Sequence, residues 1–273
     1  MSHAVFVPFA AWGHVRPLLH LVVQLVTLHP QLKATILLCP TVAPRVHKEL
    51  ASANLSHTRN TTDGASALGR VQLVEVQVKD AGTNEPGKPK DLVADMAADA
   101  IAYAEAISGY LAALFGEGAP GAPILGDKFK DIKPNMVIFD MFQSFVLAVV
   151  HQLSEQSGGK IGKIPVFAFV PSGPTSMIHH LAKEEYGGFI GPISRKVEEA
   201  VAEGQDPMPM IAAILGKAPV LAMFAMFQTF WSPYLTGTIG TAVEEMETEA
   251  KLFFEQHLGK PWLFVGIQYP ENF

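Results

Sequence analysis

The chain has 273 residues, of which 49% are hydrophobic and 17% are charged. This balance excludes an intrinsically disordered protein and predicts a single, well-packed globular domain. The formal net charge of −6 is distributed without a basic tract, which argues against nucleic acid as a partner.

Cys39 is the only cysteine, so no intramolecular disulfide forms, and a reducing compartment is indicated. The N-terminus shows no signal-peptide pattern, and we therefore expect a cytoplasmic protein. The most apolar window, residues 211–231, contains Lys217 and Pro219. We favour a buried or pocket-lining helix there over contact with a membrane.

Short apolar runs predict strands of a parallel sheet that is covered on both faces. These runs are residues 4–9, 34–39, 71–78, 136–139, 166–170 and 263–265. Helical patterns lie between them, at residues 15–26, 91–115, 142–156 and 241–257. Segments with turn-forming composition are expected as loops at residues 54–69, 80–90 and 116–133. The alternation predicts an α/β, Rossmann-like parallel sheet flanked by helices.

The first strand and helix meet at Gly13 and His14. In open α/β sheets, ligands bind at the carboxyl ends of strands, which is where this turn lies. The positive end of the helix dipole disfavours the imidazolium form of His14, so the ring is suited to accept a proton as a general base.

Asp140 is the natural partner for such a base, because it follows the apolar strand at residues 136–139. Adjacent parallel strands would bring both side chains to one edge of the sheet, where a carboxylate can orient and stabilise a protonated imidazole. The alternative is a purely structural role for each residue. In that case His14 is a hydrogen-bonded loop residue and Asp140 caps a helix.

Other chemistry has less support in the sequence. Nucleophile-elbow, dinucleotide-binding and Walker glycine patterns are all missing. His179 and His180 stand near Glu184 and Glu185, but the spacing favours a solvated helix face, and we expect no metal site. The window at residues 208–231 is rich in methionine and aromatic residues, which indicates core packing or, alternatively, the lining of an apolar pocket.

The run Phe6-Val-Pro-Phe-Ala-Ala-Trp-Gly-His14-Val-Arg-Pro-Leu-Leu resembles the N-terminal signature of family 1, UDP-sugar-dependent glycosyltransferases of GT-B fold. Later segments agree with that family in order, at residues 133–140, 164–172, 241–247 and 261–266. The fold implied is one half of a GT-B architecture.

The resemblance implies an inverting transfer. His14 would deprotonate an acceptor hydroxyl, Asp140 would balance the imidazolium, and the oxygen would displace UDP from the sugar. Acceptors of the family are apolar small molecules, and the UDP-sugar is a donor substrate, so no cofactor is implied. The matching positions for acceptor binding are Trp12, Gly13, Phe142, Pro171 and Ser172.

The sequence ends at Phe273, before the family's second Rossmann domain, which holds the UDP-sugar. Residues 1–266 match the acceptor domain, and residues 267–273 match the start of the linker. We therefore expect an acceptor-binding half that is active only when a donor domain is supplied. The alternative is a non-catalytic small-molecule-binding or scaffold protein derived from the family.

Overall fold

A parallel sheet lies at the centre of the computed structural model, and its strands run in the order β3-β2-β1-β4-β5-β6-β7. The strands are β1 (Ser2–Val7), β2 (Leu32–Leu38), β3 (Val71–Glu75), β4 (Met136–Asp140), β5 (Val166–Val170), β6 (Gly237–Gly240) and β7 (Trp262–Phe264). The structure describes residues 2–51, 64–78, 92–115, 129, 131–157, 164–174, 177, 191–207, 209–210, 234–242 and 244–265. The α/β, Rossmann-like sheet expected from the sequence is confirmed.

The order of the strands reverses its direction between β1 and β4. From β1 the chain builds outward through β2 and β3, and from β4 it builds the opposite way to β7. Because β1 pairs in parallel with β4, with Val7 beside Phe139, the carboxyl ends of these strands are neighbours. This boundary is the topological switch point at which open α/β sheets bind ligands.

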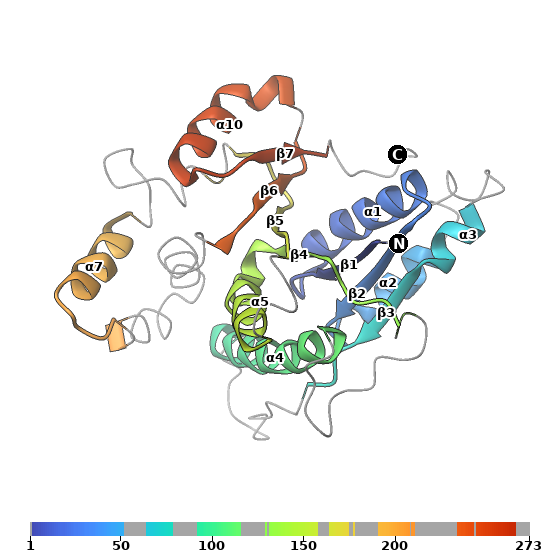
Figure 1. The fold of residues 1–273 in the computed structure, drawn as a ribbon, viewed down its shortest axis with the longest axis horizontal. Coiled ribbons are helices and arrows are strands. Elements are labelled where there is room, and N and C mark those ends of the chain that lie inside the picture. Colours follow the sequence, from blue (N-terminus) through green and yellow to red (C-terminus); the bar gives the residue numbers. More distant parts are fainter. Residues whose placement is uncertain are drawn as a thin grey trace.

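Helices cover both faces of the sheet (Figure 1). They are α1 (Trp12–Leu28), α2 (Ala43–Ala51), α3 (Gly64–Gly69), α4 (Leu92–Phe115), α5 (Phe145–Gln156), α7 (Gly191–Ala202) and α10 (Glu244–Leu258), with a short 3-10 turn, η2 (Met141–Gln143). Successive side chains of a strand point to opposite faces, so β1 contributes to two apolar clusters. Ala4 and Phe6 pack with α1 and α2, whereas Val5 and Val7 pack with α4 and α5.

Several expected boundaries shift by a few residues. The strand expected at 4–9 is Ser2–Val7, the one at 34–39 is Leu32–Leu38, and the one at 71–78 ends at Glu75. The helix expected at 142–156 divides into η2 and α5, because the carboxylate of Asp140 caps the short turn first. The strand at 166–170 matches its prediction.

Some elements were not expected from the sequence. They are β6, α2, α3 and α7, and α3 corrects the end of the loop expected at residues 54–69. The loop expected at 80–90 and most of that at 116–133 lie outside the described residues, as do Gly266 and residues 267–273. The window at 211–231 also lies outside them, and so does the window at 208–231 except for residues 209–210. None of the helices in the described part of the chain is both long and apolar enough to cross a membrane.

Candidate active site

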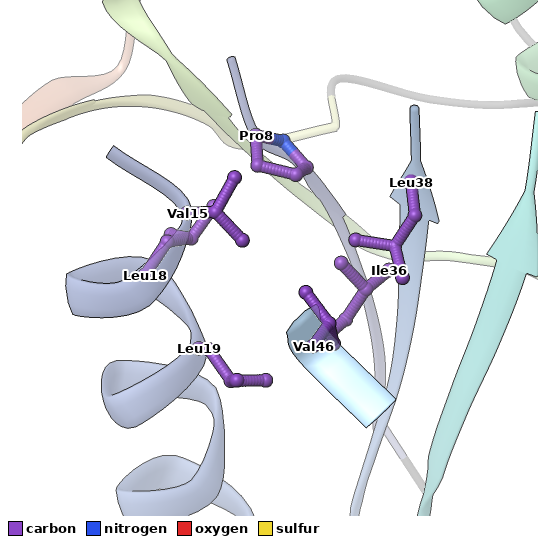
Figure 2. Close-up of a pocket in the computed structure, with 7 residues that line it drawn as sticks. All are labelled: Pro8, Val15, Leu18, Leu19, Ile36, Leu38 and Val46. Carbon is purple, nitrogen blue, oxygen red and sulfur yellow. The ribbon is translucent and has the colours of Figure 1, made fainter. Parts of the chain in front are cut away.

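The position of His14 is set by the way α1 is anchored. The helix begins after Ala11, whose carbonyl accepts hydrogen bonds from the backbone N–H groups of His14 and Val15, both at 2.9 Å. Val15 points into an apolar recess between α1, α2 and β2 (Figure 2). Successive helical side chains are about 100° apart, so burying Val15 leaves His14 free to face the neighbouring β4.

The apolar recess is closely packed. Its walls are aliphatic side chains and one proline ring, from residues Pro8, Val15, Leu18, Leu19, Ile36, Leu38 and Val46 (Figure 2). It therefore acts as a support beneath the turn that carries His14, because apolar side chains removed from water hold the helix against the sheet.

His14 and Asp140 form a direct hydrogen bond at the switch point. Nδ1 of His14 lies 2.8 Å from Oδ2 of Asp140. Asp140 is fully buried, whereas 22% of the His14 side chain is exposed. An ionised carboxylate only accepts hydrogen bonds, so Nδ1 carries the proton and Nε2 has a lone pair available; this tautomer is assigned from the hydrogen bond.

The second oxygen of Asp140 has a different partner. Oδ1 accepts a hydrogen bond of 3.0 Å from the backbone N–H of Phe142. One carboxylate oxygen of Asp140 thus contacts His14, and the other caps the turn that follows β4. These contacts keep the carboxylate in a single orientation.

The electrostatics of Asp140 follow from its burial. Burial raises the pKa of Asp140, while the hydrogen bonds and charge of His14 and the N–H of Phe142 oppose that rise. A carboxylate that water does not solvate gains more from a neighbouring positive charge than an exposed one does. Asp140 is thus placed to stabilise an imidazolium on His14.

The residues expected to bind an acceptor lie along the same edge. The ring of Phe142 packs against the imidazole of His14, with the two centroids 5.0 Å apart. Gly13 is exposed in the first turn of α1, and Trp12 is half-buried against the apolar cluster that α1 shares with β1 and β2. Pro171 and Ser172 follow β5, the strand next to β4, and are half-buried.

Phe9 is a further residue of this site that the sequence did not indicate. Its ring centroid lies 5.4 Å from that of His14 and 5.2 Å from that of Phe142. The sequence placed Phe9 at the end of the first strand, as one more core residue. Because β1 ends at Val7, Phe9 instead lies in the turn and reaches the imidazole.

Within the described residues, no group of three or more His, Cys, Asp and Glu side chains is arranged to hold a metal ion. His179, His180, Glu184 and Glu185 lie outside those residues. The arrangement that the structure does place at the switch point is a carboxylate–imidazole pair beside two aromatic rings. Such a pair is able to accept a proton from a hydroxyl group.

Comparison of sequences finds no family model and no curated protein that match the chain. Solved structures do match. One is UGT2 of Phytolacca americana, complexed with UDP-2-fluoro-glucose and pterostilbene; its TM-score is 0.57 at 13% identity, and the match covers 100% of this chain and 55% of that one. Another is UGT89C1 of Arabidopsis thaliana, with a TM-score of 0.54 at 13% identity and coverage of 99% and 51%.

A UGT transferase of Siraitia grosvenorii in complex with UDP matches with a TM-score of 0.53 at 13% identity, covering 97% of this chain and 50% of that one. The chain thus spans about half the length of these structures. At 13% identity, these structural matches show the fold alone and do not establish an activity. The resemblance seen in the sequence is confirmed for the fold: the chain has the α/β fold of about half of a GT-B glycosyltransferase.

Proposed function

We propose that this chain is the acceptor-binding half of an inverting UDP-sugar-dependent glycosyltransferase. The observation that carries the proposal is the hydrogen bond between His14 and Asp140 at the switch point of the sheet. The pair has the orientation that a general base requires, with one ring nitrogen bound to a buried carboxylate and the other able to accept a proton.

In the proposed step, Nε2 of His14 takes the proton of an acceptor hydroxyl. The hydroxyl oxygen forms a bond to the anomeric carbon of the sugar, while the bond from that carbon to the UDP oxygen breaks and UDP leaves with its electron pair. Attack on the face opposite the leaving group inverts the configuration of that carbon. Asp140 stabilises the imidazolium, and the step uses no resident cofactor.

The acceptor is proposed to be an apolar small molecule with a hydroxyl group. Support comes from the aromatic side chains near the base: Phe142 contacts His14, and Phe9 contacts both. Apolar walls with a few polar groups are the usual composition of small-molecule sites. Trp12, Gly13, Pro171 and Ser172 are proposed to complete this surface. The structures that share the fold include complexes with quercetin and with pterostilbene, which have this chemistry.

The UDP-sugar is proposed to be held mainly by a second half of the enzyme. The chain spans about half of the matching structures, and those structures include complexes with UDP, UDP-L-rhamnose and UDP-2-fluoro-glucose. We place the assembled enzyme in the cytoplasm, because a single cysteine fits a reducing compartment.

The test is to fuse the chain to the remaining half of the Phytolacca enzyme and to assay glucose transfer from UDP-glucose to pterostilbene and quercetin. Replacing His14 with Ala should reduce the rate by a factor on the order of 10² to 10⁴, as expected when a general base is removed. His47→Ala is the matched control, because His47 is exposed on α2 and bonds to Glu75 away from the site.

Transfer that His14→Ala leaves unchanged would contradict the proposal. If the isolated chain binds the phenolic acceptor with an affinity indifferent to Asp140→Ala, and the fusion transfers no sugar, the non-catalytic alternative is supported instead. Binding is measured on the isolated chain by calorimetry, so the two outcomes are separable.

A further inference from the structure

We propose that Phe9 and Phe142 are positioning residues which hold the imidazole of His14 against Asp140. Together the two side chains are called the aromatic clamp below. The inference rests on the proposed function, since it concerns how the base is oriented, but its test reads the orientation itself and does not depend on sugar transfer.

The three rings are in mutual contact. His14 lies 5.4 Å from Phe9 at an interplanar angle of 71°, and 5.0 Å from Phe142 at 57°. The two phenyl rings lie 5.2 Å apart at 49°. These are tilted and edge-to-face arrangements, the geometries that aromatic pairs prefer. The imidazole is therefore packed against rings from two separate segments of the chain.

Each ring of the clamp belongs to the segment that carries one member of the pair. Phe9 lies in the turn between β1 and α1, before His14, and Phe142 follows Asp140 in η2. The backbone N–H of Phe142 also donates to Oδ1 of Asp140. Phe142 thus fixes the carboxylate with its backbone and the imidazole with its side chain.

The clamp is needed because one hydrogen bond does not confine a partly exposed ring. With 22% of its side chain exposed, His14 has access to water as a competing partner. Packing on its aromatic neighbours removes the side-chain orientations in which Nδ1 turns away from Asp140. The clamp is therefore what maintains the tautomer with the proton on Nδ1 and the free lone pair on Nε2.

The test follows the His14 tautomer by ¹⁵N NMR on the labelled 273-residue chain at mildly alkaline pH. His14→Gln identifies the signals by their loss. In the unaltered protein we expect the proton predominantly on Nδ1. In Phe9→Leu and Phe142→Leu we expect a several-fold shift of the tautomer ratio toward the proton on Nε2, the form that free imidazole side chains favour in water.

Two variants control for loss of packing alone. Phe9→Tyr retains a ring and should restore the tautomer ratio. Phe254→Leu removes another buried ring, one that packs edge-on against Trp262 at 4.5 Å, and should leave His14 unchanged. If Phe9→Leu fails to fold in a thermal scan, Phe9→Met takes its place.

A wild-type tautomer ratio in both ring-deleted variants would overturn the inference, as would an equal shift in Phe254→Leu. If the tautomer ratio responds to the clamp variants as expected but the fusion transfers no sugar, the proposed function is contradicted and the inference about the clamp is not.

Discussion

His14 and Asp140 are 126 residues apart in sequence, and their side chains meet at 2.8 Å. The contact is a consequence of sheet topology. Asp140 ends β4 and His14 lies in the first turn of the helix that follows β1, and these strands are neighbours at the point where strand order reverses. Rigid, buried strands thus fix the geometry of a pair that sits at the boundary with solvent.

Asp140→Asn should separate stability from chemistry. The amide oxygen of Asn can still accept from the N–H of Phe142, while its NH₂ group donates to Nδ1 of His14. The imidazole proton then moves to Nε2, and the base is lost. In the fusion enzyme we expect transfer to fall by a factor on the order of 10³ to 10⁴. The thermal unfolding temperature at neutral pH should be unchanged or slightly higher, because a buried charge is removed.

A large fall in the unfolding temperature of Asp140→Asn would contradict this account. It would mean that the carboxylate contributes to the fold through its charge. Asp131→Asn is a suitable control for the change of residue type, since Asp131 is exposed.

His14→Ala should lose stability in a pH-dependent way. Burial already raises the pKa of Asp140, and His14 opposes that rise, so its removal raises the pKa further. A carboxyl whose pKa is higher in the folded protein than in the unfolded chain costs stability as pH rises from the unfolded value of 3.8 through the folded one. The deficit against wild type should therefore grow toward neutral pH, reaching about 1–3 kcal/mol.

The measurement is urea unfolding across the acidic to neutral range. The double variant His14→Ala with Asp140→Asn carries no ionisable carboxyl at the site, so its deficit against Asp140→Asn alone should not grow toward neutral pH. A deficit in His14→Ala that is equally flat would show that the loss comes from packing alone.

The pairing of His14 with Asp140 was predictable because it follows from a simple rule. Asp140 directly follows one apolar run and His14 lies a short turn after another, and parallel strands carry such positions to one edge of the sheet. The fold class was predictable for the same reason, since strands buried on both faces are apolar throughout. Neither inference needs the exact ends of the strands.

The contacts that depend on exact boundaries were not predictable. Phe9 was assigned to the first strand, and only the end of β1 at Val7 turns its ring toward His14. β6 was missed because its sequence, Gly-Thr-Ile-Gly, has low strand propensity. Its glycines leave room for side chains such as Pro261 and Trp262, which are distant in sequence. The charged helix α7 shows too few apolar positions to stand out.

His3 should make the stability of the folded protein sensitive to acid. Its side chain is buried; Nδ1 donates to the carbonyl of Ile132 at 2.7 Å, and Nε2 accepts from the hydroxyl of Thr35 at 2.8 Å. Burial lowers the pKa of His3, and the positive charge of Lys33 lowers it further. The hydrogen bond to Ile132 partly offsets this lowering.

The folded state thus binds a proton at His3 less readily than the unfolded chain, whose value is 6.5. Stability should decline as pH falls from about 6.5 toward the lower folded value, by up to about 1.4 kcal/mol per pH unit. His3→Gln removes the titrating ring, so the difference in unfolding free energy between it and wild type should change with pH over this interval. A constant difference would contradict the role assigned to His3.

Glu49 should contribute stability that is lost at low pH. Oε1 of Glu49 on α2 accepts hydrogen bonds from Arg16 at 2.9 Å and His20 at 3.2 Å, both on α1. Burial acts to raise the pKa of Glu49, but the hydrogen bonds and charges of Arg16 and His20 outweigh it and lower the pKa below 4.5. The stabilisation is therefore present above pH 4.5 and disappears as pH falls through the folded value.

Glu49→Gln should cost up to about 1 kcal/mol at neutral pH, because the site is only partly shielded from water. The cost should shrink in acid. Glu199→Gln is the matched control, since Glu199 bonds to Arg195 at 3.0 Å on an exposed surface. An equal cost for both variants would mean that the α1–α2 contact confers nothing special on Glu49.

A side chain at Gly240 should destabilise the fold, although the position in β6 has no unusual backbone angle. A Cβ atom placed on Gly240 would lie 2.5 Å from Nε1 and 2.7 Å from Cζ2 of Trp262, whose indole is 1% exposed. A buried indole that packs edge-on against Phe254 has little room to move. Gly240→Ala should therefore cost about 1–3 kcal/mol in urea unfolding, the usual penalty for overpacking.

Gly69→Ala provides the comparison, because a Cβ atom there meets nothing within 4 Å. Its unfolding free energy should stay within about 0.5 kcal/mol of wild type. The obstacle at Gly240 is the indole of Trp262. Gly240→Ala should therefore cost less stability in a Trp262→Leu background than in the wild-type background. Equal effects of Gly240→Ala in both backgrounds would show that the indole is not the obstacle.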